Sequence, residues 1–220
     1  MKYETDSTVE ASSESRRLFL RHSVVAIVGL AALPVSLLGC SRQRGSAAAS
    51  SATSGEHEAL SWSTRIGTDA EPGTPLVVSG TIYAADGRTP LEGATLYVYH
   101  TDARGLYNEE QRDPARLARL RGWMLTGRDG RYEFRTIKPA PYPGRTIPAH
   151  IHATVKAPGL EERWITEYWF DDDPLLPQAE RERYAGAGAF SPIMRLTRDS
   201  AGVLRGTRDI RYSEGTPINR

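Results

Sequence analysis

The sequence of 220 residues contains a single cysteine, Cys40, so no disulfide bond can form within the chain. A zinc or iron–sulfur site built on several cysteines is excluded for the same reason. Any metal would have to be bound by histidine, tyrosine or carboxylate side chains. Net charge is also small, at +1, which gives no reason to expect a nucleic acid as partner.

Long apolar runs are equally scarce. The one at residues 24–39 is broken by Pro34 and is short for a membrane span. It follows Arg16-Arg17 and ends in Leu37-Leu38-Gly39-Cys40, an order that is typical of a twin-arginine-type lipoprotein signal. We therefore predict that residues 1–40 are an export signal and that the protein is lipid-anchored at the cell envelope through Cys40, its only membrane contact. The alternatives are an uncleaved N-terminal anchor and a chance apolar run.

The rest of the chain divides into two parts by composition. Residues 41–62 begin with a stretch rich in Ser, Ala and Gly, which predicts a flexible tether. Residues 63–220 have the composition of an ordinary globular domain, and their length suits one domain.

Short segments rich in β-branched and aromatic residues, separated by Gly/Asp turns, fill this domain. They are 76–83, 94–100, 131–136, 149–155, 163–170, 193–196 and 203–212, with 199–202 as the turn of a hairpin between the last two. We predict an all-β fold, a β-sandwich of seven or more short strands with one or two short helices in loops. One helix is expected at 115–121, with Asp113 as N-cap and Pro114 at the first helical position, and another at 177–184.

Two histidines and a tyrosine form the most informative cluster. If 149–155 is a strand, His150 and His152 point to one face of it. Tyr142 stands between Pro141 and Pro143, which hold it on a stiff extended loop. Two imidazoles and a phenol are the beginning of a metal site. The alternative is structural, because such pairs also occur on solvated faces and tyrosines usually pack in a core or at its rim.

Tyr107 follows the predicted strand at 94–100 and could add a second phenol. Two tyrosinates with two histidines would favour Fe(III) over Fe(II), since phenolate is a hard, negatively charged ligand. His100, at the end of a strand, is expected to be structural rather than a ligand.

Six motifs in order resemble the intradiol ring-cleavage dioxygenases, most closely the protocatechuate dioxygenase branch. They are Gly80-Thr-Ile-Tyr83, Pro90-Leu-Glu-Gly-Ala94, the segment 99–107, the segment 126–139, Pro141-Tyr-Pro143 and Pro148-Ala-His-Ile-His152. The resemblance implies a non-haem Fe(III) held by Tyr107, Tyr142, His150 and His152. It also implies cleavage of a catechol by O2 between the two hydroxyl-bearing carbons, giving a cis,cis-muconate-type product. Tyr142 would leave the metal and accept a substrate proton.

The sequence departs from that family at two positions. Ile147 stands where well-studied members carry arginine, and Arg145 is the candidate replacement for its charge. Glu167 stands where those members usually carry glutamine, and Arg163 is a candidate partner for its carboxylate. The two changes suggest a catechol without a carboxylate as substrate. The catalytic candidates are thus Tyr107, Tyr142, Arg145 and Glu167, with a small catechol and O2 as partners.

Other readings remain open at this point. A resemblance to transthyretin-like or Cna-B-like sandwiches is also present, in the segments 78–83, 90–94 and 129–134. A non-catalytic surface module is therefore one alternative. A metal-binding but inactive homologue is another. The sequence does not decide the oligomeric state, and a homo-oligomer is retained as an alternative.

Overall fold

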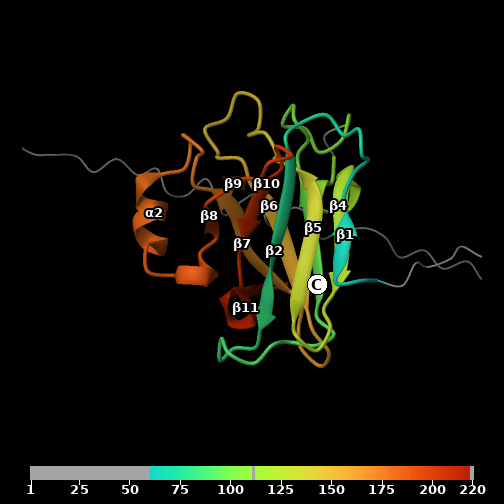
Figure 1. Ribbon diagram of the computed structural model, residues 1–220, viewed down its shortest axis with the longest axis vertical. Helices are drawn as coiled ribbons and strands as arrows, with labels where there is room; N and C mark the ends of the chain where they lie inside the picture. The colour runs from blue at the N-terminus through green and yellow to red at the C-terminus, as the bar shows by residue number, and fades with distance from the viewer. Residues whose placement is uncertain (1–59, 111, 219–220) are drawn as a thin grey trace, which may run out of the picture. The chain divides into compact units, whose positions relative to one another are not determined.

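The computed structural model describes residues 60–110 and 112–218 (Figure 1). The predicted signal at 1–40, with Cys40, and most of the predicted tether lie outside the described residues. Within the described residues, none of the helices is long and apolar enough to cross a membrane.

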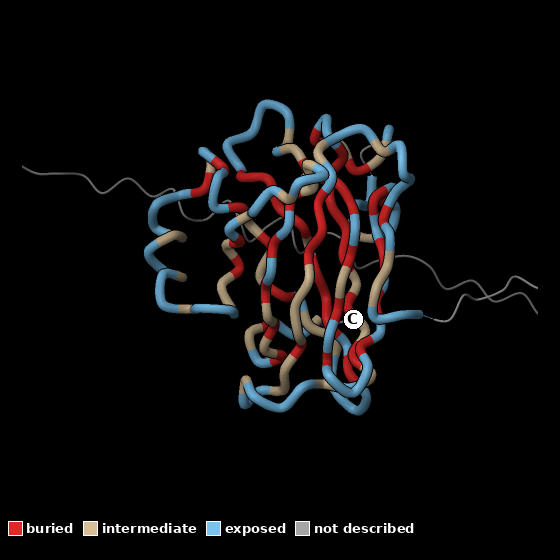
Figure 2. The backbone as a smooth tube through the Cα atoms, viewed as in Figure 1, coloured by how far each residue is buried: buried red, intermediate tan, exposed pale blue. Residues whose placement is uncertain are grey.

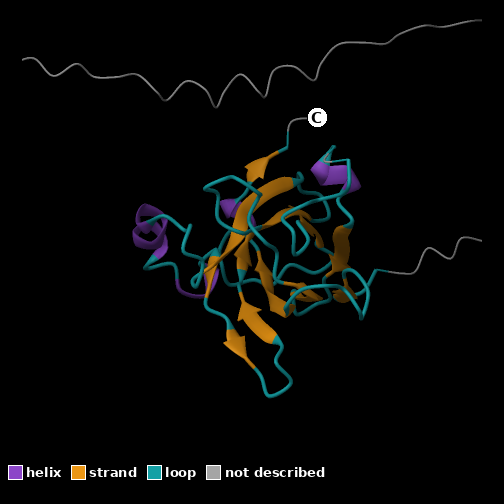
Figure 3. Ribbon diagram, turned by 90° about the horizontal axis from the view of Figure 1, so that it is seen from above, coloured by secondary structure: helices purple, strands orange, loops and turns teal. Residues whose placement is uncertain are grey.

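Two mixed sheets of six strands each make up the fold, as a sandwich-like pair of layers (Figures 1 and 3). The first sheet runs in the order β1 (Ser63–Arg65), β5 (Arg131–Ile137), β2 (Pro75–Tyr83), β10 (Leu204–Thr207) and β9 (Thr197–Arg198), and β11 (Ile210–Arg211) also pairs with β2. The second runs β12 (Thr216–Pro217), β7 (Arg163–Phe170), β6 (Ile151–Lys156), β3 (Thr95–His100) and β4 (Leu120–Leu125), and β8 (Ile193–Met194) also pairs with β7. The predicted all-β sandwich is confirmed.

Helices are short and lie at the margins of the two layers (Figure 3). They are α1 (Pro114–Leu117), α2 (Gln178–Tyr184) and the 3-10 turns η3 (Gly188–Phe190) and η4 (Tyr212–Glu214). The helix predicted at 177–184 is confirmed by α2.

Alternation along the strands builds the core. In β4 every second residue is buried, and β2 and β5 contribute Val78 and Phe134, each with no exposed surface, from the facing sheet. Buried residues accordingly run through the middle of the two layers, and exposed ones occupy the loops (Figure 2). Each large apolar side chain removed from water in this way stabilises the fold by about 1.5–3 kcal/mol.

Several sequence predictions of local structure need correction. The helix predicted at 115–121 is wrong in its second half, because α1 ends at Leu117 and β4 begins at Leu120, paired with β3. Asp113 has a left-handed backbone, with φ of 39°, and its side chain makes no capping hydrogen bond. The predicted histidine strand begins late, at Ile151, so His150 lies just before β6 and not within it.

The hairpin around residues 199–202 is present, since β9 and β10 pair antiparallel on either side of it. Its first arm is β9, whereas the predicted 193–196 segment contributes β8, which pairs with β7.

The end of β3 defines where the site can form. His100, its last residue, is opposite Ile151 at the start of β6 and Leu120 at the start of β4. The loop that leaves β3 and the loop that enters β6 therefore lie at the same end of the sandwich, the upper end in Figure 1. These two loops carry Tyr107 and Tyr142.

Candidate metal centre

The loop that leaves β3 is folded around the carboxylate of Asp102. Asp102 Oδ1 accepts hydrogen bonds from the backbone N–H groups of Arg104 and Leu106, at 2.8 and 3.1 Å. The Asp102 N–H donates to the Leu106 carbonyl at 2.9 Å, and the N–H of Arg119 donates to the carbonyl of Tyr107 at 2.8 Å. These bonds fix the backbone on both sides of the tyrosine.

The second loop is tied to the first at Ala140. Its carbonyl accepts a hydrogen bond from Thr101 Oγ1 at 2.7 Å, and its N–H donates to the Asp102 carbonyl at 3.2 Å. Tyr142 follows two residues later, between two prolines whose rings restrict the backbone. The position of Tyr142 relative to Tyr107 is thus set by direct contacts between the loops.

Four side-chain atoms from these segments converge on one point. The Nε2 atoms of His150 and His152 are 3.0 Å apart. Tyr142 Oη lies 2.9 Å from His150 Nε2 and 3.5 Å from His152 Nε2. Tyr107 Oη lies 2.8 Å from His152 Nε2 and is in direct contact with Tyr142 Oη. The sequence-predicted ligand set is therefore brought together, although His150 precedes the strand.

The outer nitrogen of each imidazole faces an acceptor. His150 Nδ1 is 2.7 Å from the carbonyl of Pro148, so it carries the proton and leaves the Nε2 lone pair directed into the cluster. His152 Nδ1 is 3.6 Å from Glu167 Oε1, which favours the same tautomer. Both imidazoles consequently present lone pairs to the point where the phenols meet.

Burial controls the charge of this cluster. Desolvation raises the pKa of Tyr107 and of Tyr142, so neither phenol ionises on its own at neutral pH. Burial also lowers the pKa of His150, assisted by the neighbouring His152, so this imidazole is neutral, as a metal ligand must be. Only a cation placed among the four atoms would turn the phenols into phenolates.

The donor set fits one small, highly charged ion. Nitrogen and oxygen ligands sit about 2.0–2.2 Å from such an ion, so neighbouring ligands of one ion are about 3 Å apart. The separations of 2.8–3.5 Å match this spacing. Among residues 60–110 and 112–218, no group of three or more His, Cys, Asp or Glu side chains could hold a metal, so an ion here depends on the tyrosines.

Glu167 lies beside the cluster and is partly exposed, with 38% of its side chain accessible. Burial by itself raises the pKa of its carboxyl, but the neighbouring His152 and backbone N–H outweigh this, and the net pKa is lowered. Glu167 is therefore an anion at neutral pH. The predicted partner Arg163 is wrong, because its guanidinium donates to the Gly215 carbonyl at 2.7 Å instead.

An open depression of about 500 Å³ adjoins the two phenols. It is lined by Gly105, Tyr107, Pro114, Tyr142, Pro143, Arg145 and Ile147. Arg145 lines this depression together with Ile147, which is 43% exposed. The walls are mainly apolar, with one guanidinium.

Several supporting residues had no signal in the sequence. Tyr99 stacks on the His152 ring at a centroid distance of 4.6 Å and an angle of 17°. Asp173 is buried and accepts a hydrogen bond from the backbone N–H of Ala149 at 2.8 Å, just before His150. A His-x-His motif predicts neither contact, because both partners come from distant segments.

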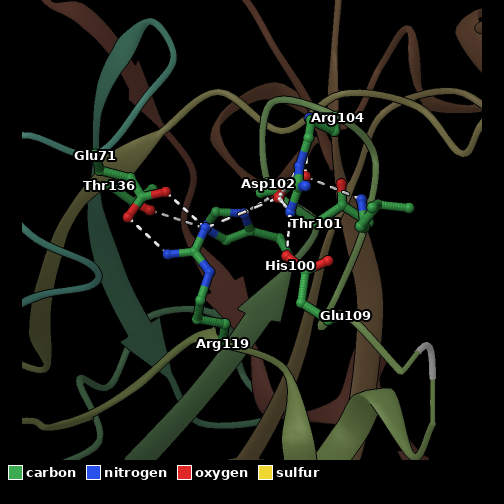
Figure 4. A network of polar contacts seen from close by, with 9 residues as sticks. Glu71, His100, Thr101, Asp102, Arg104, Glu109, Arg119 and Thr136 are labelled. Atoms are coloured by element: carbon green, nitrogen blue, oxygen red, sulfur yellow. Dashed lines mark hydrogen bonds and ion pairs between the residues drawn. The ribbon is translucent and has the colours of Figure 1, made fainter.

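A network of charged side chains surrounds the first loop (Figure 4). Asp102 lies between Arg104, at 2.9 Å, and Arg119, at 3.9 Å, and Arg119 pairs in turn with Glu71 at 2.7 Å. His100 is fully buried beside it, with its ring nitrogens 2.7 Å from the Thr101 carbonyl and 2.8 Å from Thr136 Oγ1. Its predicted structural role is confirmed, since it lies outside the four-atom cluster.

Comparisons with known proteins agree with this fold. A family model described as dioxygenase matches residues 51–185. Catechol 1,2-dioxygenase 1 of Acinetobacter lwoffii is 33% identical over 161 residues, 66% of this chain and 50% of that protein. The protocatechuate 3,4-dioxygenase beta chain of Burkholderia cepacia is 31% identical over 136 residues, 52% of this chain and 57% of that protein. The chain spans about half the length of the curated relatives it matches.

Two solved structures that resemble this chain are also dioxygenases. The dioxygenase domain of a dioxygenase carbohydrate-binding protein fusion from Streptomyces sp. SirexAA-E is 31% identical, with a TM-score of 0.50 over 68% of this chain and 88% of that one. Catechol 1,2-dioxygenase from Acinetobacter sp. ADP1 has a TM-score of 0.54 at 21% identity, covering 73% of this chain and 58% of that one, which shows a shared fold.

The chain belongs to the intradiol ring-cleavage dioxygenase family. It is a distant homologue of the catechol and protocatechuate dioxygenases, and both branches are represented among the similar proteins. Members of the family typically use a non-haem Fe(III).

Proposed function

We propose that this protein is a non-haem Fe(III) dioxygenase that cleaves a catechol between its two hydroxyl-bearing carbons with O2. The proposal rests on the convergence of two phenol oxygens and two imidazole lone pairs on one point. Hydrogen bonding among neutral side chains does not require four such metal-binding atoms to face one another. Tyr107, Tyr142, His150 and His152 would hold the ion. The chemistry that a bound Fe(III) supplies is Lewis acidity towards both catechol oxygens and activation of the ring for O2.

The two tyrosines have different parts in this proposal. Tyr107 is 7% exposed and its backbone is fixed on both sides, which suits a permanent ligand. Tyr142 is only half-buried and borders the open depression. Its Oη is therefore the group that can turn away and accept a proton from a substrate hydroxyl.

The other residues orient the imidazoles and keep water away from the substrate ring. The Pro148 carbonyl and Glu167 hold the imidazole tautomers, and Pro143 and Ile147 supply apolar surface against which a ring can pack and from which water is excluded.

The same surroundings favour a substrate without a carboxylate. Ile147 offers no charge, and Glu167, an anion on the far side of His152, repels a negative substituent. Arg145 is exposed on the loop, where water screens it. We propose uncharged catechols, or ring-substituted catechols without acid groups, as the substrate class.

Visible absorption is the direct test of the metal centre. Protein reconstituted with Fe(III) is expected to bind one iron per chain and to absorb in the visible range through tyrosinate-to-iron charge transfer. His152→Ala should lose both iron and colour, and His57→Ala, in the predicted tether, should keep both. Wild-type protein that stays colourless and iron-free after reconstitution would contradict the proposal.

Oxygen uptake with a catechol panel tests the substrate class. Catechol should be consumed faster than protocatechuate, and Ile147→Arg should shift the preference towards protocatechuate. Coloured, iron-loaded protein that consumes no oxygen with any member of the panel would instead favour the inactive metal-binding homologue.

We also propose that the protein is exported and held at the cell envelope by lipid on Cys40, on the basis of the sequence of residues 1–40. Cys40→Ala should move the protein from the membrane fraction to the soluble fraction, and Ser41→Ala should not. Equal membrane association of Cys40→Ala and wild type would contradict the anchor.

A further inference from the structure

A second cavity, of about 470 Å³, lies beside β7, where the end of α2 meets η3 and the β11–η4 segment. Its apolar lining comes from Tyr184, Phe190 and Pro192, and the guanidinium of Arg211 lies over the ring of Phe190 at 4.4 Å. Arg208 and Arg211 are the charged residues of its inner lining. None of these residues belongs to the candidate metal centre.

Arg208 is held in place along its whole length. Its backbone N–H donates to the Ser79 carbonyl at 3.0 Å, and its own carbonyl accepts from Tyr132 Oη at 2.6 Å. The guanidinium lies 4.6 Å above the ring of Tyr168, and its Nη1 donates to the Thr166 carbonyl at 2.7 Å. The charge is therefore fixed at the inner wall of the cavity, in a side chain with no exposed surface.

Part of this buried guanidinium has no acceptor. Arg208 Nε and Nη2 donate no hydrogen bond to the described residues, and the closest carboxylate oxygen, Glu214 Oε2, is 3.9 Å from Nη2. Arg211, stacked at 4.4 Å on Phe190, likewise has an unpartnered Nε. Each buried donor without a partner costs about 1–3 kcal/mol, so an acceptor in the cavity would remove this penalty.

Positive charge also exceeds negative charge around the cavity. Arg183 adds a third guanidinium at the mouth, where it pairs with Glu180 of its own helix at 3.8 Å. Glu214 is the one carboxylate among the described lining residues. Burial raises the pKa of the Glu214 carboxyl. A cavity whose lining has a net positive charge attracts anions.

We propose that this cavity is a binding site for a small carboxylate with a flat apolar body, such as an aromatic acid. Guanidinium groups bind carboxylates through paired hydrogen bonds, and Arg208 and Arg211, which both line the cavity, each have buried guanidinium nitrogens without an acceptor among the described residues. Tyr184, Phe190 and Pro192 would pack against the apolar body. The site is independent of the proposed dioxygenase activity.

Calorimetric titration of the full chain with benzoate tests the proposal, with benzamide as the uncharged analogue and inorganic phosphate as the non-aromatic anion. Benzoate should bind once per chain and more tightly than either control.

Arg211→Gln should weaken benzoate binding about tenfold or more, since one charge-assisted hydrogen bond is lost. Glu214→Gln should strengthen it about threefold, because a competing carboxylate is removed. Arg128→Gln, at an exposed position away from the cavity, should leave it unchanged.

Arg208→Met should abolish benzoate binding while circular dichroism stays as in wild type. If that variant does not fold, the opposite effects of Arg211→Gln and Glu214→Gln decide. Benzamide or phosphate binding as tightly as benzoate would overturn the assignment. So would benzoate binding that neither Arg211→Gln nor Glu214→Gln changes.

Discussion

The four converging side chains differ in how firmly their surroundings fix them. His150 is fixed at its ring by the Pro148 carbonyl and at the preceding residue by Asp173. Tyr107 is fixed through its backbone and by burial, whereas Tyr142 keeps an exposed side. The role of each hydroxyl can therefore be tested separately from the packing of its ring.

Removing the Tyr107 hydroxyl should weaken iron binding without unfolding the protein. Tyr107→Phe keeps the buried ring and loses one of the two phenol oxygens in the cluster. We expect a lower iron content after dialysis and loss of most visible absorption, measured by metal analysis and spectroscopy. Tyr99→Phe is the matched control, because the Tyr99 ring stacks on His152 and its hydroxyl is not in the cluster. Equal iron retention in the two variants would exclude Tyr107 as a ligand.

His100 should make stability fall in acid. Burial lowers its pKa to about 4, below the ordinary value near 6.5. Because the folded state favours the neutral ring, the stabilisation is complete above about pH 6.5 and is lost as the pH falls towards 4. Urea unfolding at pH 7.5 and 4.5 should show that His100→Gln loses about 2 kcal/mol less than wild type over this interval. Parallel losses in both proteins would show that other groups dominate.

At this scale the sequence predicts the four converging side chains but not the groups that hold them. Tyr142, His150 and His152 lie within eleven residues, and family motifs single out Tyr107. Thr101 and Asp173 bond backbone groups of distant segments, so no spacing along the chain reveals them. The charged partner expected for Glu167 is likewise replaced by an imidazole from β6.

At the scale of elements, the two loops that carry the tyrosines pack directly against each other. The one leaving β3 turns sharply at Gly105, whose φ is +82° and whose backbone packs against the Pro141 carbonyl of the other loop. A Cβ at this position would lie 2.2 Å from the Pro141 oxygen. The close approach of the loops that carry Tyr107 and Tyr142 thus requires glycine, which has no side chain, at position 105.

Gly105→Ala should therefore separate the loops and impair the metal centre. Gly144→Ala is a matched control, because Gly144 also has a positive φ, of +68°, but a Cβ there would meet nothing within 4 Å. The control should cost only the backbone penalty of about 1–2 kcal/mol. Gly105→Ala should cost more and also lower iron affinity, as measured by denaturation and metal titration. Equal effects of the two substitutions would show that the loop contact is unimportant.

The elements themselves were mostly predictable, with one instructive exception. The segment 115–121 is rich in Ala, Leu and Arg, which favour a helix in isolation. In the fold, Leu120 and Arg121 are opposite His100 and Tyr99 of β3, and the alternating burial of β4 outweighs the local preference. Propensity is a weak guide where pairing with a distant strand buries every second side chain.

At the scale of the whole molecule, the first sheet is completed by the C-terminal segment. β10 and β11 pair in parallel with β2, which places β2 in the interior of its sheet. Leu204 and Ile210 add buried side chains to the core. The second sheet carries the histidines and does not need β10.

A chain ending at Val203 should therefore aggregate. It leaves one side of β2 without hydrogen-bond partners, and an exposed strand edge pairs readily with other copies. Sedimentation should show soluble wild type and associated truncated protein. A chain ending at Gly215 is the control, since it loses only β12, a two-residue strand at the border of the second sheet. A monomeric, folded chain ending at Val203 would contradict this account.

The position of β10 also bears on the order of events during biosynthesis. A ribosome delivers the chain from its N-terminus, so Tyr107, Tyr142, His150 and His152 all emerge well before residues 204–211. The second sheet can begin to assemble while β2 still lacks its parallel neighbour. Every nascent chain thus passes through an interval in which its histidine-bearing sheet lacks only β12, whereas β2 in the other sheet lacks both β10 and β11. During that interval one edge of β2 is open to pairing with another chain.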